Sequence, residues 1–158
     1  MSDRIEWLAE RDQHAALIIR TDYSDEQAWA VVKAELIRSW GDGDGEPHHH
    51  IVDDPRWAGW TSDQILSAAS ADEELSVVFL ADRDSMRDGP TTLLAVSVLV
   101  REECDSDEEF EEDSGEIRIV PAGIHEMHAN LMIANLSFSD FKEAAMEDPR
   151  GTFQGFAM

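Results

Sequence analysis

Five aspartates lie where the sequence predicts that three buried strands end. They are the acids of the segments "RTD", "VDDP" and "ADRD": Asp22, Asp53, Asp54, Asp82 and Asp84. If the three strands are parallel neighbours, their carboxyl ends meet at one edge of the sheet, where open α/β sheets bind ligands. Carboxylate oxygens at this density suit Mg²⁺ or Ca²⁺, so these residues form a candidate cation site. The alternative is a structural role, because aspartate also forms turns and caps helices in such positions.

Histidines provide a second set of possible metal ligands. They lie in the segments "HHH" and "HEMH": His48, His49, His50, His125 and His128. The second group has an i, i+3 spacing that zinc ligands can show, but the H-E-x-x-H arrangement of zinc proteases is missing. A five-residue strand spans about 17 Å, so the first group and the aspartates of "VDDP" lie at opposite edges of the sheet. The sequence leaves open whether these histidines bind a metal.

No motif of the chain completes a known catalytic arrangement. The segment "VVFLADRDSM" resembles the D-x-D nucleophile motif of haloacid-dehalogenase-type phosphotransferases, which needs Mg²⁺ and a phosphate-pairing lysine. Both lysines, Lys33 and Lys142, fall within predicted helices. The chain also lacks a G-x-S-x-G elbow, a Walker loop and a G-x-G-x-x-G segment. The sequence therefore favours a protein that is not an enzyme, and leaves the question open.

Acidic residues dominate the composition. Asp and Glu number 35 against 12 Lys and Arg, for a net charge of −23, and Glu102 to Glu116 holds ten of the acids and no base. The rest of the chain, with 25 acids against 12 bases, is acidic as well. Such a field repels nucleic-acid backbones and anionic membranes and attracts basic protein surfaces. Solubility is the competing explanation, since two lysines against ten arginines is typical of proteins from GC-rich or salt-adapted genomes.

Two aromatic residues and four glutamates are candidate partner-binding residues. Trp57 and Trp60 flank Gly59 in a predicted turn, and aromatic side chains in loops often anchor a binding partner. The alternative is that both rings pack a helix onto the sheet. The glutamates belong to the acidic segment, which would meet a basic surface: Glu108, Glu109, Glu111 and Glu112.

Apolar runs and helix caps indicate the elements that position these residues. A continuous apolar run predicts a buried strand at 15–19, and further segments rich in apolar residues predict strands at 48–52, 75–81, 91–100 and 116–121. A capping box of Ser24 with Gln27 predicts a helix over 25–39. A second capping box, Thr61 with Gln64, predicts a short helix that ends near residue 70. Towards the C-terminus, "NLMIA" and "TFQGF" are possible strands and "SFSDFKEAAM" is a helix between them.

The order of these elements predicts a single α/β domain over residues 14–158. Helices that alternate with the first strands imply a parallel βαβαβ start, and the closely spaced later strands imply antiparallel additions to a mixed sheet. Residues 1–13 form a polar leader, and 102–115 a solvated acidic loop, because nine acids within twelve residues repel each other. The N-terminus is too charged for a signal peptide, and no apolar stretch reaches the ~20 residues of a membrane span, so a cytoplasmic protein is expected.

Several short blocks resemble those of an uncharacterised actinobacterial domain family of unknown function: "RTDYSDEQAW", "VDDPRWAGWTSDQIL", "VVFLAD", "IRIVP" and "NLMIANLSFSDF". They follow in order over residues 17–156, nearly the whole chain. The resemblance carries no activity, but it implies that the "RTD", "VDDP" and "AD" blocks belong to the family pattern. The acidic segment and the three consecutive histidines look like departures from that pattern.

Two functions remain for a chain of this kind. The first is a non-enzymatic binding or regulatory module, immunity-like in its action, that holds a basic protein partner. The second is a divalent-cation-dependent enzyme or sensor that uses the aspartate cluster with Mg²⁺ or Ca²⁺. The sequence sets neither the identity of the partner nor the oligomeric state.

Overall fold

The structure, a computed structural model, describes residues 16–38, 49–53, 55–69, 77–86, 91–98, 104–132, 136–149 and 151–153. The predicted leader at 1–13, together with His48 and Asp54, lies outside these residues. The elements follow one another in the order β1 (Ala16–Arg20), α2 (Glu26–Arg38), β2 (His49–Val52), η1 (Pro55–Trp57), α3 (Ser62–Ala69), β3 (Val77–Ala81), η2 (Arg83–Met86), β4 (Leu93–Ser97), α4 (Asp107–Asp113), β5 (Glu116–Ile119), α5 (Pro121–Met132), α6 (Phe138–Met146) and β6 (Thr152–Phe153). Of these, η1 and η2 are short 3-10 helices.

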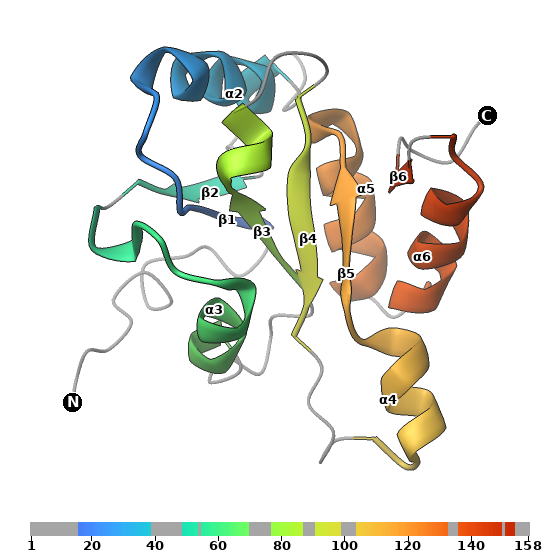
Figure 1. The fold of residues 1–158 in the computed structure, drawn as a ribbon. Coiled ribbons are helices and arrows are strands. Elements are labelled where there is room, and N and C mark those ends of the chain that lie inside the picture. Colours follow the sequence, from blue (N-terminus) through green and yellow to red (C-terminus); the bar gives the residue numbers. More distant parts are fainter. Residues whose placement is uncertain are drawn as a thin grey trace.

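The described strands form one six-stranded sheet in the order β2-β1-β3-β4-β5-β6 (Figure 1). β1 pairs in parallel with β2 on one side and with β3 on the other. β4 runs antiparallel to both β3 and β5, and the short β6 extends the sheet in parallel with β5. The prediction of an α/β domain with a parallel start and later antiparallel strands is therefore confirmed.

Helices cover both faces of the sheet and give the molecule three layers (Figure 1). Along β1 the side chains alternate, so that Ile18 faces one core and Leu17 and Ile19 face the other. The first core is closed by α2, α5 and α6, and the second by α3 together with Trp57 of η1. This burial on two sides explains why the central strands have continuous apolar runs instead of alternating ones.

Side-chain caps fix the starts of the two helices that follow β1 and β2. At α3, the main-chain N–H of Thr61 donates to Gln64 Oε1 (2.9 Å) and that of Gln64 donates to Thr61 Oγ1 (3.2 Å), which confirms the predicted capping box. At α2, the prediction that Ser24 is the cap is wrong. The cap is Asp25, whose Oδ1 accepts the N–H of Ala28 (3.0 Å), while the Ser24 hydroxyl donates to Asp22.

The acidic segment forms a helix where a loop was predicted over 102–115. Helix α4 begins after Ser106, whose hydroxyl accepts the main-chain N–H of Glu109 (3.1 Å). Three of its acids lie in the first turn, where the helix dipole favours negative charge. A loop is the wrong prediction because this cap and contacts with neighbouring elements stabilise a helix despite the high charge density. None of the residues of α4 is buried, and water reaches its carboxylates, Asp113 only in part.

The segment "NLMIA" was predicted as a strand, but its first three residues belong to helix α5. A short apolar run does not distinguish a strand from a buried helix, and here Ile124, Met127 and His128 are buried at helical spacing. Pro121 occupies the first helical position, where a missing N–H has no cost. None of the described helices, α5 included, has the length and apolar content needed to cross a membrane.

Gly123 lets α5 lie close to the sheet. A Cβ atom at this position would stand 3.2 Å from Cδ2 and Cε2 of the Phe153 ring and 3.3 Å from Cγ1 of Ile119. Both neighbours are buried and have no room to move away. We expect Gly123→Ala to lower the free energy of unfolding by about 1–3 kcal/mol, because the overpacking outweighs a gain in helix propensity of about 1 kcal/mol. Urea denaturation measures the change.

The Phe153→Leu background provides the control for this substitution. Leucine removes the ring atoms nearest to the added methyl group, so Gly123→Ala should cost less there than in the wild type. An alanine variant that is as stable as the wild type with Phe153 in place would contradict the close approach of helix and sheet.

Candidate functional site

Asp22 and Asp53, which follow β1 and β2, lie at the same edge of the sheet as Asp82, which follows β3. Ile19 of β1 lies beside Val52 of β2, and Arg20 of β1 lies beside Ala81 of β3, so the segments that follow these strands leave the sheet together. Two of the aspartates there, Asp53 and Asp82, bind arginines. The result is two arginine–carboxylate clusters along the edge that was predicted to hold a cation.

The first cluster surrounds Arg20, whose side chain is only 2% exposed. Its Nη2 lies 2.7 Å from Glu26 Oε2 and its Nη1 lies 3.2 Å from Asp53 Oδ1. The Nε–H donates to the main-chain oxygen of Asp22 (2.9 Å). The guanidinium carbon also lies 3.9 Å from the ring centre of Tyr23 and 4.9 Å from that of Trp29. Charge pairing, hydrogen bonds and aromatic rings therefore all hold one buried cation in place.

The environment keeps Arg20 charged. Burial lowers the pKa of this guanidinium, but the hydrogen bonds and the charge attraction to Glu26 and Asp53 together outweigh that effect and hold the pKa above its ordinary value. A folded-state pKa above the unfolded one stabilises the fold at every pH below the unfolded value, and this stabilisation is lost only above the folded value. Asp53 is oriented further by the indole N–H of Trp29, which donates to its Oδ2 (3.2 Å).

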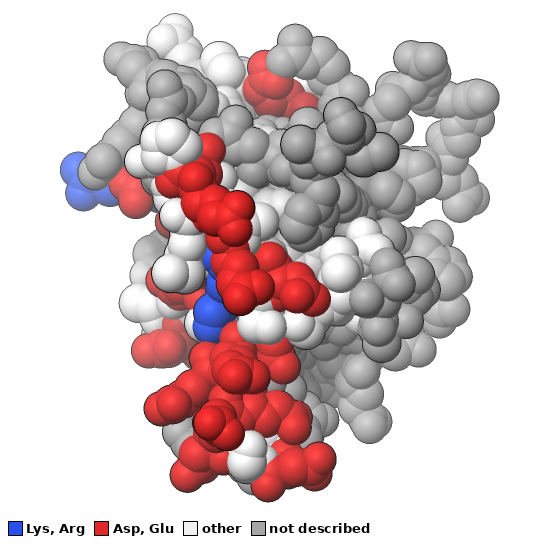
Figure 2. Space-filling view, turned by 90° about the vertical axis from the view of Figure 1, so that its right-hand side faces the viewer, with Lys and Arg blue, Asp and Glu red and all other residues white. Residues whose placement is uncertain are grey.

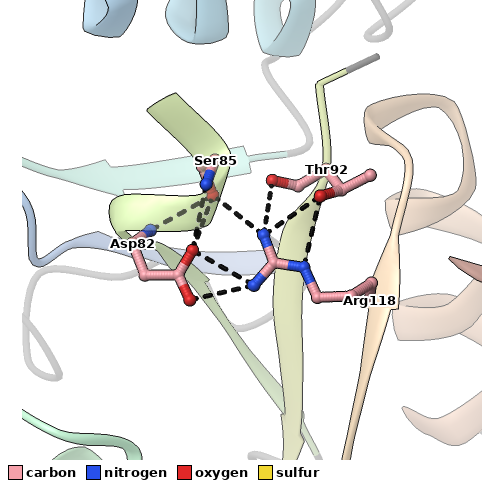
Figure 3. Close-up of polar contacts among 4 residues, drawn as sticks. All are labelled: Asp82, Ser85, Thr92 and Arg118. Carbon is pink, nitrogen blue, oxygen red and sulfur yellow. Dashed lines mark hydrogen bonds and ion pairs between the residues drawn. The ribbon is translucent and has the colours of Figure 1, made fainter. Parts of the chain in front are cut away.

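The second cluster surrounds Arg118 of β5, which reaches across β4 to the end of β3 (Figure 3). Its Nη1 donates to both carboxylate oxygens of Asp82, at 2.9 and 3.1 Å. Its Nη2 donates to the main-chain oxygen of Thr92 (3.0 Å), and its Nε to the hydroxyl of the same residue (3.2 Å). Asp82 in turn accepts the N–H of Ser85 and so caps η2 (3.1 Å). The Arg118 and Asp82 side chains are 21% and 24% exposed, so water reaches the pair in part.

The ion pairs of Asp53 and Asp82 compete with the predicted cation site for the same carboxylates. Asp22 accepts a hydrogen bond from Ser24, Asp84 is exposed on η2, and Asp54 lies outside the described residues. Within the part of the chain that the structure describes, no group of three or more His, Cys, Asp or Glu residues could hold a metal ion. A cation at this edge would require Asp53 and Asp82 to leave their arginines. A cation site formed by all five aspartates stays a prediction.

The arginines were missed by the sequence analysis, although a signal for them exists. Arg20 directly follows a buried apolar run and Arg118 interrupts another, in "IIR" and "EIRI". A charged side chain that is buried wholly or in part within a sheet needs a partner of opposite charge. The nearby aspartates were available for that purpose. Which aspartate pairs with which arginine depends on the strand order, and the sequence does not give that order.

The two tryptophans pack η1 and α3 onto the sheet. Trp57 is 3% exposed and belongs to the core formed with α3, and the Trp60 ring meets it edge-on with centres 4.5 Å apart. The intervening Gly59 has a positive φ of 79° and donates its N–H to the main-chain oxygen of Thr21 (2.8 Å). Trp57 could anchor a partner only if this core opened, whereas Trp60 is half-buried and accessible in part.

The histidines are distributed over two elements. His49 and His50 lie on β2, an edge strand of the sheet, and His125 and His128 lie on α5. His128 is 2% exposed and forms part of the helix surface that packs inward. Their role as metal ligands stays a prediction.

A continuous acidic surface covers α4 and α6. We call it the acidic ridge, and it consists of the exposed or half-buried carboxylates on and beside these helices: Asp105, Asp107, Glu108, Glu109, Glu111, Glu112, Glu143 and Glu147. Figure 2 shows Asp and Glu side chains running down this face of the molecule, with little Lys or Arg surface among them. The four glutamates predicted to bind a partner all belong to it.

Contacts at the C-terminal end of α4 hold the ridge together. Within residues 104–116 and 136–149 the one Lys or Arg is Lys142, and its Nζ donates to the main-chain oxygens of Glu111 (3.1 Å) and Ser114 (2.8 Å). The Ser97 hydroxyl donates to the main-chain oxygen of Asp113 (2.7 Å), and the N–H of Ser139 donates to Asp113 Oδ1 (3.2 Å). Lys142 is thus directed to main-chain oxygens of α4 and its following turn.

The structure defines a single-domain, three-layer α/β protein with two internal arginine–carboxylate clusters and one strongly acidic face. A model of one protein family matches residues 15–156, so the chain belongs to the family described as a domain of unknown function (DUF6924). The predicted resemblance to an uncharacterised domain family is confirmed. No curated protein matches the chain.

Proposed function

We propose that this protein is a non-enzymatic binding module that docks a basic protein surface on the acidic ridge. The observation that supports this function is the placement of the ridge carboxylates. They lie on and beside two adjacent helices on one face, and the lysine among them, Lys142, is directed to main-chain oxygens. Such a face has a strongly negative potential, which attracts a basic partner and accelerates its association.

The polar groups at the sheet edge support a structural role for that edge. Arg20 binds Glu26 and Asp53, and Arg118 binds Asp82, so these arginines and carboxylates satisfy one another. A catalytic carboxylate, by contrast, has to face a substrate or a metal. The ridge is therefore the better candidate for contact with another molecule.

A module of this kind acts by covering the basic surface of its partner. Exposed carboxylates that pair with lysines and arginines of a partner compete with any other anion for that surface. This is how an immunity-like or regulatory protein would inhibit or hold its target. The proposal includes a cytoplasmic location, where Cys104, the only cysteine of the chain, remains reduced.

Neutralising the ridge should abolish capture of basic proteins. The ridge variant changes Glu108, Glu109, Glu111 and Glu112 to Gln, and the control variant changes Asp3, Glu6, Glu10 and Asp12 to Asn or Gln. Both variants shift the net charge by the same four units. We expect the wild type and the control to recover basic proteins from a native lysate at about 50 mM salt and to release most of them at about 300 mM. The ridge variant should bind the recovered partner roughly tenfold or more weakly in a calorimetric titration, since exposed ion pairs contribute about 0.2–1 kcal/mol each.

Two results would contradict this function. Equal losses in the ridge and control variants would show that bulk charge, and not the ridge, attracts the recovered proteins. If the amount of captured protein did not change with salt over the same range, the binding would not be electrostatic. Unfolding of α4 would not explain a loss in the ridge variant, because glutamine is a good helix former and removes the repulsion between carboxylates.

A further inference from the structure

Helix α4 is an element whose own charges oppose its folding. Six of its seven residues are acidic, with Phe110 as the exception. Carboxylates that lie three or four positions apart on a helix repel each other, as in the pair Glu108 and Glu112 or the pair Glu109 and Asp113. The acids of its last turn also face the negative end of the helix dipole, and a helix of seven residues is not stable on its own.

Contacts from other elements offset this repulsion, and they are concentrated at one end. Lys142 of α6 places a positive charge on the C-terminal carbonyls of α4 and its following turn, where the helix dipole favours a cation. Ser97 of β4 and Ser139 of α6 bind Asp113. The other end has the cap of Ser106, which belongs to the same segment. None of the residues of α4 is buried, so unfolding of α4 would leave both cores of the sheet intact.

We propose that α4 is a charge-controlled conformational switch, folded against α6 by Lys142 and opened by the mutual repulsion of its carboxylates. Positive charge brought to the ridge, whether as salt cations or as a basic surface, shifts the equilibrium to the folded helix. Salt also weakens the attraction of Lys142, but this is one cation against six acids in the helix, so the loss of repulsion prevails. The switch is a property of the protein alone and does not depend on the proposed function.

Native-state hydrogen exchange on the full-length chain tests the switch. The reporters are the amides of Phe110 and Ser114, which donate to the main-chain oxygens of Ser106 and Phe110. We expect these amides to exchange faster than those of β4, and to slow by roughly threefold to tenfold as NaCl rises from about 20 to about 500 mM. The exchange rate of the Ile65 amide should depend far less on salt. This amide belongs to helix α3 and donates to the main-chain oxygen of Thr61.

Substitutions identify the charges that control the folding and opening of α4. Lys142→Met should accelerate exchange in α4 by roughly fivefold and leave β4 unchanged, whereas Lys33→Met, at an exposed site on α2, should change neither. Glu112→Gln should slow exchange in α4 and reduce its salt response, whereas Asp63→Asn, at an exposed position of α3, should do neither.

Three outcomes would overturn the proposal. The first is exchange in α4 that is independent of salt or becomes faster as salt increases. The second is exchange of Phe110 and Ser114 at the rate of the β4 amides under all conditions, which would mean that α4 opens only with the whole domain. The third is an α4 in Lys142→Met that exchanges as slowly as in the wild type.

Discussion

Replacing Arg20 by methionine should lower the free energy of unfolding by about 2–4 kcal/mol. The substitution keeps an apolar stem of similar length but removes the three hydrogen bonds to Glu26, Asp53 and the main chain of Asp22. It also removes the cation that contacts the rings of Tyr23 and Trp29. The loss is smaller than for a fully buried pair, because Glu26 is 72% and Asp53 38% exposed and both carboxylates can be hydrated instead.

Two further variants separate the shape of Arg20 from its charge. Arg20→Lys keeps the charge but cannot form all three hydrogen bonds or stack as a plane, so we expect it to recover less than half of the lost stability. Arg56→Met removes an exposed arginine that lies 5.7 Å from the Trp57 ring, and should cost less than about 1 kcal/mol. Urea denaturation followed by tryptophan fluorescence reports the three values. A methionine variant as stable as the wild type would show that the cluster does not stabilise the fold.

The sequence predicted the sheet because each strand carries its own signal. Leu17 to Ile19 of β1 and all of β3 are buried and apolar, and this pattern predicts a strand covered on both faces. Alternation with helices then implied parallel pairing for the first three strands. The capping box of Thr61 and Gln64 is equally local, since both partners lie three residues apart. Features that depend on neighbours in the chain were therefore within reach of sequence reasoning.

Features that depend on residues far apart in the sequence could not be predicted from the sequence. Asp53 lies 33 residues from Arg20, and Asp82 lies 36 residues from Arg118. Asp22, Asp53 and Asp82 follow neighbouring strands, but Asp53 and Asp82 pair with arginines. Helix α4 shows the same limit, since Ser97, Ser139 and Lys142 come from β4 and α6. Its local charge density alone indicates a loop.

A second large effect is expected at Asp82, which joins three elements. Its carboxylate binds Arg118 of β5 through both oxygens, and its Oδ1 also accepts the N–H of Ser85 within η2. Asp82→Ala should lower the free energy of unfolding by about 2–3 kcal/mol, because it leaves a half-buried guanidinium without its counter-charge and uncaps η2. Asp82→Asn keeps an oxygen for Ser85 and should cost about 1–2 kcal/mol.

A double-mutant cycle isolates the contribution of the ion pair. Combining Asp82→Asn with Arg118→Met should give a coupling energy of about 1–2 kcal/mol, measured by urea denaturation of the four proteins. A coupling energy near zero would mean that the two side chains act independently, contrary to the bonds of 2.9 and 3.1 Å between them. Repeating the cycle with added Mg²⁺ tests whether the Asp82 carboxylate binds a cation instead of Arg118. If Mg²⁺ stabilised the wild type but not Asp82→Asn, Asp82 would serve a cation, and the arginine would only replace that cation in its absence.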